Sequence, residues 1–160
     1  MKIKNIIDED FTNYKKPSMF IAFPYCTFKC DRECGKSVCQ NSELANAPDI
    51  EIKISEIIQR YINNPITSAI IIGGLEPFDS WDDLWKLIVE FRHFTTDDIV
   101  IYTGYTEEEI YNMRFVLNNL KQFPNIIIKY GRYIPEKLAI FDFVLGVNLA
   151  SSNQYARKIS

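Results

Sequence analysis

The stretch Thr67-Ser-Ala-Ile-Ile-Ile72 is rich in β-branched residues, contains no charged residue, and ends at Gly73-Gly74. Such a run predicts a strand buried on both faces, which is typical of a parallel sheet. A helix is expected to follow, with Ser80 as its N-terminal cap. Its predicted apolar face repeats at helical spacing through Trp81, Leu84, Trp85, Ile88 and Phe91.

The same order of strand, turn and helix recurs along the chain. Asp98–Tyr102 is expected to form another strand, and Thr106 with Glu109 has the spacing of a capping box that opens a second helix. That helix is predicted to present Ile110, Met113, Val116 and Leu120 on one face. Further strands are expected at Ser18–Phe23, Asn125–Lys129 and Ile140–Leu145. The alternation, at roughly 30 residues a unit, predicts βαβ units with helices packed outside a parallel sheet.

Length and composition bound the class of protein. The 160 residues predict a single domain, 1–160, and the 47% apolar fraction supplies its core. The net charge of -3 gives no general attraction to nucleic acid or to an anionic membrane, so neither is expected as a partner. Residues 1–10 contain no signal-peptide pattern, and the longest apolar runs are strand-sized. We therefore expect a cytoplasmic protein, in which thiols stay reduced.

All four cysteines lie in one stretch, Cys26-Thr-Phe-Lys-Cys30-Asp-Arg-Glu-Cys34-Gly-Lys-Ser-Val-Cys39. Reduced thiols so close together are typical of an iron–sulfur cluster or a zinc ion. Zinc sites most often pair cysteines as C-x2-C, which is absent here, whereas the first interval is C-x3-C. A closed site would need four protein ligands, while a catalytic cluster with an open iron would need three.

Three turns that could carry chemistry each follow a predicted strand. The cysteine stretch follows Ser18–Phe23, Gly73-Gly74 follows the second strand, and Thr103-Gly104 follows the third. In folds built from βαβ units, active sites form at the carboxyl ends of the strands. The paired glycines would let a ligand approach the backbone, and Glu76 offers a carboxylate to a cationic group. The plain alternative for this segment is a strand-ending turn.

The cysteine stretch resembles the signature of the radical S-adenosylmethionine (SAM) family, in which C-x3-C is followed by a third cysteine with an apolar or aromatic residue before it. The matching residues are Cys26, Cys30, Val38, Cys39, Gln40 and Asn41. The resemblance implies a [4Fe–4S] cluster held by Cys26, Cys30 and Cys39, with Cys34 inside an insertion. The spacing departs from the usual one, so Cys34 stays open as the third ligand or as a fourth.

Four later segments are similar to the activating proteins of anaerobic ribonucleotide reductase, a group within this family. In chain order they are Gly73–Phe78, Tyr102–Tyr105, Lys129–Tyr133 and Ala150–Gln154. The first carries an extra residue, Leu75, inside the family's Gly-Gly-Glu/Asp-Pro motif, which binds the amino group of SAM. The resemblance implies that the SAM site includes Val38, Gln40, Gly73, Gly74, Glu76 and Thr103.

The resemblance also implies a fold and a reaction. The fold would be α/β, an incomplete (β/α)6 barrel of parallel strands with outer helices. SAM would chelate the open iron of a three-cysteine [4Fe–4S] cluster and be cleaved reductively to methionine and a 5′-deoxyadenosyl radical. That radical would take a hydrogen atom from a glycine of the large subunit of anaerobic ribonucleotide reductase. A flavodoxin-type protein would donate the electron.

Two other functions are compatible with the residues. One keeps the radical chemistry but applies it to another glycyl-radical enzyme or to a small molecule. The other is a non-catalytic module in which all four cysteines close a zinc or iron–sulfur site, and it predicts no SAM binding.

Overall fold

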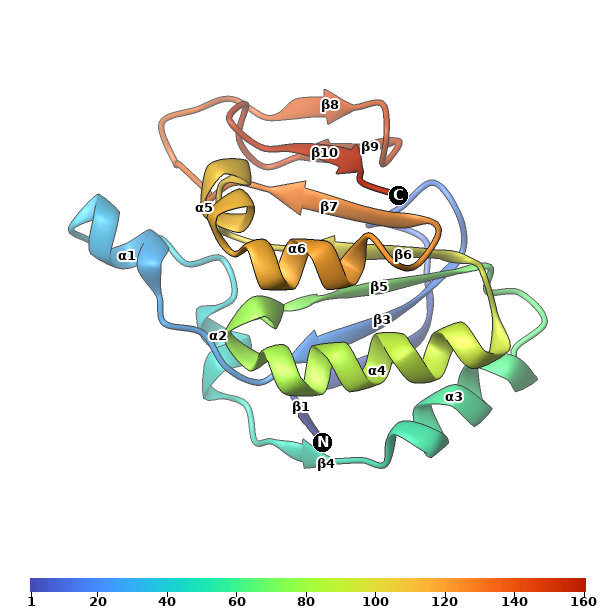
Figure 1. Ribbon diagram of the computed structural model, residues 1–160. Coiled ribbons are helices and arrows are strands. Elements are labelled where there is room, and N and C mark those ends of the chain that lie inside the picture. The colour runs from blue at the N-terminus through green and yellow to red at the C-terminus, as the bar shows by residue number, and fades with distance from the viewer.

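The computed structural model describes residues 1–160 and contains a six-stranded sheet in the order β10-β7-β6-β5-β3-β2 (Figure 1). Its central strands are β3 (Ser18–Phe23), β5 (Ala69–Gly74), β6 (Asp98–Tyr102) and β7 (Ile126–Tyr130). Each of these pairs in parallel with the next. The strands predicted in these four regions are confirmed, because unbroken apolar, β-branched runs suit a sheet that is covered on both faces.

The two edge strands differ from the expected parallel run. β2 (Asn5–Asp10) is antiparallel to β3, and β10 (Tyr155–Lys158) is antiparallel to β7. Parallel neighbours need a long crossover, usually a helix, whereas a short loop joins β2 to β3 and no helix lies between β7 and β10. The closing of these strands into an incomplete barrel stays a prediction.

The segment 140–145, predicted as one more strand of the sheet, belongs to a separate hairpin. There β8 (Ile140–Asp142) pairs antiparallel with β9 (Val147–Leu149). Gly146, just before β9, has φ 75°, a left-handed conformation that favours glycine and lets the chain reverse. The Asp142 carboxylate joins the hairpin to the sheet by accepting the N–H of Ala156 in β10 at 2.8 Å.

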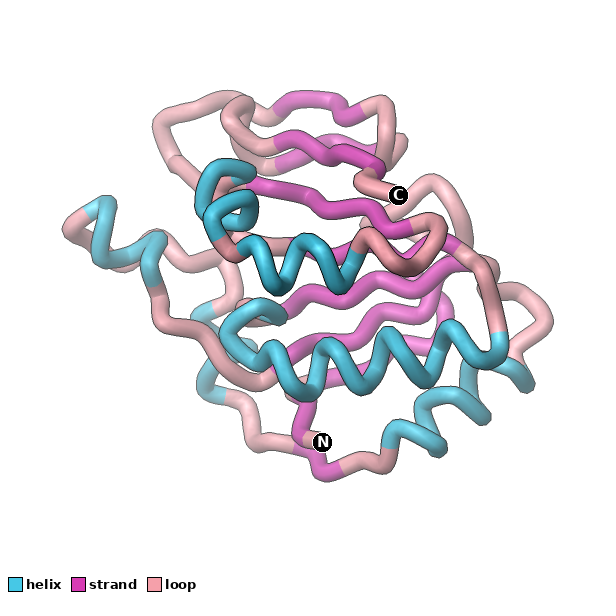
Figure 2. The backbone as a smooth tube through the Cα atoms, viewed as in Figure 1, coloured by secondary structure: helices cyan, strands magenta, loops and turns pink.

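Four helices cover one face of the sheet, as Figures 1 and 2 show. They are α3 (Ile54–Asn63), α4 (Trp81–Phe94), α5 (Glu107–Asn112) and α6 (Arg114–Leu120). Ile70 and Ile72 belong to the large apolar cluster under these helices, while Ile71 packs on the opposite face with Tyr14 and Leu145. Loop 11–17 and the β8–β9 hairpin therefore supply the cover of that opposite face.

Two helix starts were predicted, with different outcomes. The capping box of α5 is confirmed, since Thr106 Oγ1 accepts the N–H of Glu109 at 3.2 Å and Glu109 Oε2 accepts the N–H of Thr106 at 2.8 Å. Ser80 takes the predicted N-cap position of α4, but its side chain makes no capping hydrogen bond. Pro77–Ser80 form a 3-10 turn, η1, which the Glu76 side chain caps. The helix predicted after Thr106 is also divided, since Met113 leaves helical geometry (ψ 59°) between α5 and α6.

The remaining elements are short. The cysteine stretch forms α1 (Lys29–Cys34), and α2 (Ser42–Asn46) follows it. β1 (Lys2–Ile3) and β4 (Ile50–Glu51) form a small antiparallel pair. None of the helices combines the length and the apolar character that a membrane crossing requires.

Candidate functional site

A cavity of about 410 Å³ lies at the carboxyl ends of the parallel strands. Gly74 of β5, Tyr102 of β6 and Lys129 of β7 all lie in its wall. The rest of the wall comes mainly from the cysteine stretch and the residues just after it, from loop 11–17 and from the segment 147–150. The structure thus brings together the three turns that the sequence placed at strand ends, which is where open α/β sheets bind ligands.

The four cysteines are divided by this cavity. Cys26, Cys30 and Cys39 line it, and Cys34 does not. All four are free thiols and partly exposed. No three cysteine, histidine, aspartate or glutamate side chains converge on a point that one metal ion could occupy. A [4Fe–4S] cluster meets each thiolate at a different iron, so three sulfurs spread around a cavity fit a cluster better than a single zinc ion.

The unusual interval between Cys30 and Cys39 has a structural explanation. The intervening residues form most of α1 and a return turn, with Gly35 in the left-handed region at φ 64°. One carboxylate oxygen of Asp31 then accepts the N–H groups of Val38 and Cys39 at 2.8 and 2.9 Å. Asp31 therefore fixes the backbone of Cys39 against the helix that carries Cys30.

The turns after β5 and β6 hold the cysteine stretch at both ends. The Asp79 carboxylate accepts the N–H of Thr27 at 2.8 Å and the hydroxyl of Tyr105 at 2.6 Å. At the other end, Asn41 donates from Nδ2 to the carbonyl of Gly74 at 2.6 Å. The position of the thiols is therefore set by the turns that follow the neighbouring strands.

An ion-pair network attaches α1 to the rest of the site. Arg132, which is 8% exposed, binds Glu109 through two hydrogen bonds of 2.9 and 2.7 Å and lies 3.1 Å from Glu33 of α1. Lys29 of α1 lies 3.5 Å from Glu109 and 4.2 Å from the centre of the Tyr105 ring. The hydrogen bonds from Arg132 are the main reason that the pKa of Glu109 is lowered to about 2.

Burial sets the protonation of the two inner thiols. It raises the pKa of Cys26 to about 11 and also raises the pKa of Cys30. Both are therefore protonated at neutral pH when no metal is bound. Because only thiolates bind iron, loading a cluster must release these protons.

Glu76 is present in the cavity wall, but its carboxylate already has partners. It is 5% exposed, accepts from Thr103 Oγ1 and the N–H of Phe78 through Oε1 at 2.8 and 3.2 Å, and accepts from the N–H of Gly104 through Oε2 at 2.8 Å. Burial raises its pKa to about 7 despite these bonds. Glu76 therefore joins the ends of β5 and β6 as well as facing the ligand space.

The other expected contact residues are divided between wall and support. Gln40, Gly74 and Thr103 line the cavity, whereas Val38 and Gly73 do not. A Cβ on Gly74, which has φ 87°, would lie 2.7 Å from the Cα of Ala22. A Cβ on Gly73 would lie 3.2 Å from the Cβ of Tyr102. The paired glycines thus allow close packing of neighbouring strands, a role that the ligand-approach interpretation missed.

Lys129 is a buried charged residue of the wall to which the sequence analysis assigned no role of its own, beyond its place in the segment Lys129–Tyr133. It is 7% exposed, donates from Nζ to the carbonyl of Gly131 at 3.0 Å, and burial lowers its pKa to about 8. Its signal in the sequence is one charged residue at the end of the apolar run Asn125–Lys129. Gln154, also buried in the wall, donates to the same carbonyl of Gly131 at 3.1 Å.

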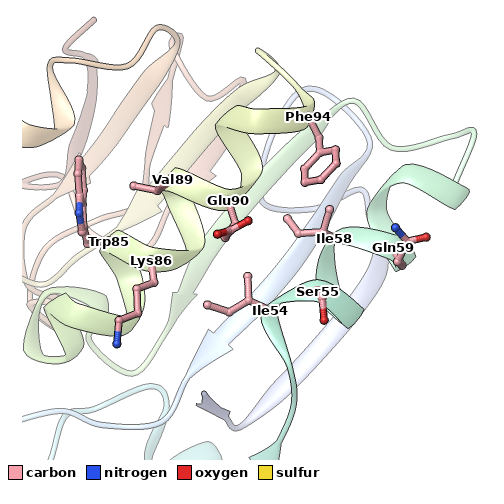
Figure 3. A pocket seen from close by; sticks show the side chains of 9 residues that line it. All are labelled: Ile54, Ser55, Ile58, Gln59, Trp85, Lys86, Val89, Glu90 and Phe94. Carbon is pink, nitrogen blue, oxygen red and sulfur yellow. The ribbon is translucent and has the colours of Figure 1, made fainter.

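A second cavity, of about 490 Å³, lies between α3 and α4 (Figure 3). Ile54 and Ile58 extend toward α4, and Phe94 closes one end of the groove. The charged residues of this groove, Lys86 and Glu90, are exposed. It contains no thiol and no buried charge, so it offers nothing for redox or metal chemistry.

Comparison with known proteins adds one finding. The sequence model of a family described as a 4Fe-4S single cluster domain matches residues 17–140. No curated protein and no solved structure matches the chain. The matched residues run from the start of β3 to β8 and include every cysteine.

Proposed function

The chain belongs to the 4Fe-4S single cluster domain family, and from this membership we propose that it is a radical SAM activase. In this proposal Cys26, Cys30 and Cys39 bind three irons of a [4Fe–4S] cluster and leave the fourth iron open. The observation that carries it is the division of the cysteines, three in the wall of the strand-end cavity and Cys34 outside it. Three thiolates leave a coordination position that a second ligand can occupy.

The cavity has the size and the chemistry for this use. Its volume of about 410 Å³ is within the range of small-molecule sites, roughly 300–1,000 Å³. The thiols supply soft ligands for iron, while Phe20, Leu44 and Leu75 supply apolar surface in the same wall. Apolar surface around a cluster limits access of water, which is one factor that sets its reduction potential.

The residues opposite the thiols suit a cationic amino-acid cofactor. Glu76 places a carboxylate in the wall for the ammonium and sulfonium groups of SAM, and Thr103 and Gly104 hold that carboxylate in place. A bound cluster and SAM would supply one-electron radical chemistry at this site. The protein's part is to orient the cofactor against the open iron and to keep water away from it.

The proposed substrate is a glycine of the large subunit of anaerobic ribonucleotide reductase, with a flavodoxin-type electron donor in the cytoplasm. Two segments that resemble the reductase-activating proteins support this choice, because both reach the cavity. Thr103 and Gly104 come from the first, and Ala150 and Gln154 come from the second. The resemblance therefore falls on residues that would contact the cofactor or the incoming substrate.

One observation favours a second candidate, the non-catalytic four-cysteine module. Cys34 lies four residues after Cys30 on α1, a spacing that puts both side chains on one face of the helix. A closed site would require Cys34 to reach the thiols in the cavity wall. The two candidates differ in the number of thiolate ligands and in SAM binding.

Anaerobic reconstitution with iron and sulfide, followed by reduction and addition of SAM, tests the proposal. The expected results are release of 5′-deoxyadenosine and an electron paramagnetic resonance signal that changes when SAM is added. Cys34→Ala should retain both results, and Cys39→Ala should lose both. A reducible cluster that neither responds to SAM nor cleaves it, and that needs Cys34, would reject the activase and support the closed module.

A further inference from the structure

Arg132 lies beside the thiols of Cys26 and Cys30 but outside the wall of the strand-end cavity. Its side chain lines a separate void of about 20 Å³, which both cysteines also line. That volume has room for about one water molecule and none for a larger ligand. Only 8% of Arg132 is exposed, so its positive charge is held inside the protein next to two proposed cluster ligands.

The ion pairs of Arg132 leave one of its donors without a partner. Nη1 and Nη2 bind the two carboxylate oxygens of Glu109, and Nη2 also lies 3.1 Å from Glu33. The Nε–H group is buried and has no hydrogen-bond partner. An unpaired buried donor costs about 1–3 kcal/mol, and native proteins contain few of them. The two ion pairs therefore do not account for the whole guanidinium group.

The sulfur of Cys30 lies close to this side chain. A Cβ on Gly104 would lie 3.6 Å from Cys30 Sγ and 3.8 Å from Arg132 Cγ, so the sulfur and the arginine flank the same point. Glycine at position 104 keeps the space between them free of a side chain. A thiol is a weak hydrogen-bond acceptor, whereas the thiolate that binds iron carries a negative charge and accepts more strongly. A bound cluster thus creates the acceptor that the Nε–H group lacks.

We propose that Arg132 is a positioning residue that donates its Nε–H to the Cys30 sulfur of the loaded protein and thereby raises the reduction potential of the cluster. This inference rests on the ligand set of the proposed function and deepens it, since it names the residue that tunes the cluster from outside the strand-end cavity. Uptake of one electron makes a cluster more negative. A positive charge and a hydrogen bond at a ligand sulfur therefore stabilise the reduced form more than the oxidised form.

The test measures the midpoint potential of the anaerobically reconstituted protein, without SAM, by titration with titanium(III) citrate. Arg132→Met should shift the one-electron reduction equilibrium about tenfold toward the oxidised cluster, which is a potential about 59 mV lower. Lys36→Met is the matched control, because it removes a positive charge from the same cysteine stretch at an exposed position, where Lys36 pairs with Glu136. It should shift the equilibrium by less than about twofold, since solvent and salt screen an exposed charge.

A second measurement uses the wild type, so it does not depend on the folding of a variant. The reduced cluster is paramagnetic, and protein labelled with ¹⁵N at arginine Nε should show a coupling between the cluster and an arginine nitrogen in pulsed electron paramagnetic resonance. The labelled Arg132→Lys variant should lose this coupling. The labelled Arg92→Lys variant should keep it, although Arg92 Nε is also buried without a partner, because Arg92 lies in neither of the cavities that the cysteines line.

The outcomes separate the inference from the proposed function. A loaded wild type without the arginine coupling, or a loaded Arg132→Met variant with the wild-type potential, overturns the inference alone. If Arg132→Met cannot be loaded, the coupling in the wild type supports the inference and its absence overturns it. A cluster that shows both effects but does not cleave SAM rejects the activase and leaves the role of Arg132 in place. A wild type that loads no cluster overturns the proposed function and the inference together.

Discussion

The strand-end cavity and the groove between α3 and α4 have similar volumes, about 410 and 490 Å³, but different walls. The groove is made of apolar side chains and exposed charges, whereas the strand-end cavity contains thiols and the buried charges of Glu76 and Lys129. Buried charges reduce stability unless they are compensated. A wall that contains them therefore identifies a functional site better than volume does.

The largest expected difference between the two cavities is in iron binding. Cys30→Ala should lower the iron and sulfide content after reconstitution by roughly tenfold or more, because it removes a ligand from the wall. Phe94→Ala, at the end of the groove, should load like the wild type. Iron and sulfide analysis with absorption spectra would measure both. Equal loading of Cys30→Ala and Phe94→Ala would place the cluster elsewhere.

A substitution in the closely packed backbone beside the strand-end cavity should cost more stability than one at an open position. Gly74→Ala should lower the free energy of unfolding by about 3 kcal/mol, because the new methyl group meets Ala22 and the backbone is left-handed. Gly35→Ala is the matched control, since Gly35 is also left-handed but its Cβ would meet nothing within 4 Å. Its expected cost is about 1 kcal/mol. Urea unfolding of the cluster-free variants distinguishes steric contact from backbone strain. Equal losses of unfolding free energy would show that contact with Ala22 adds no cost.

Asp31 tests whether the return of Cys39 to the cavity depends on one carboxylate. Asp31→Ala removes the acceptor of two backbone N–H groups. The free energy of cluster binding should therefore become less favourable by about 2 kcal/mol. Asp31→Asn keeps an acceptor oxygen and should behave more like the wild type. The rate at which a chelator removes iron would report the difference. The same rate for Asp31→Ala as for the wild type would show that Cys39 is held by other contacts.

The smallest expected effect is the difference in stability between two ion pairs, one beside the strand-end cavity and one in the groove. The pKa of Glu109 falls from 4.5 to about 2, so its pairing stabilises the fold above pH 4.5 and is lost as the pH falls toward 2. Glu109→Gln should therefore lower the free energy of unfolding by about 1–2 kcal/mol at pH 7, discounted for partial exposure, and have little effect near pH 2. Glu90→Gln, in the groove, removes an exposed contact 3.6 Å from His93 and should cost less than about 0.5 kcal/mol at pH 7.

Unfolding of both variants between pH 2 and pH 7 would measure this contrast. A cost for Glu109→Gln that does not change with pH would show that the Arg132 contact acts through packing rather than charge.

Much of the fold could be predicted because its signals are local. The run at 67–72 and the repeat from Trp81 to Phe91 identify β5 and α4, and the spacing of Thr106 and Glu109 identifies the start of α5. β10 was not predicted, because it pairs with β7 across residues 131–154, and pairing at that distance leaves no local pattern. β2 and the β8–β9 hairpin pair with segments nearby in sequence, but β2 carries acidic residues through its second half, and β8 and β9 have only three residues each.

The segments that form the candidate site could be predicted from the sequence, but the hydrogen bonds that hold them together could not. Clustered thiols identified the cysteine stretch, and turns after strands identified the other walls. The role of Asp31 was missed because its partners are seven and eight residues away in a turn of irregular geometry. Lys129 was missed because a charged residue at the end of an apolar strand usually reaches solvent. In the structure Lys129 is 7% exposed and lies in the wall of the cavity that the segment 147–150 also lines.

The cover that loop 11–17 and the β8–β9 hairpin give the sheet has a consequence for biosynthesis. A ribosome makes the cysteine stretch and the central strands before it makes the segment 147–154, which supplies Ala150 and Gln154 to the cavity wall. A nascent chain can therefore present its thiols while the cavity still lacks one wall. A cluster delivered at that stage would meet a cavity that is open on the side later closed by the segment 147–154.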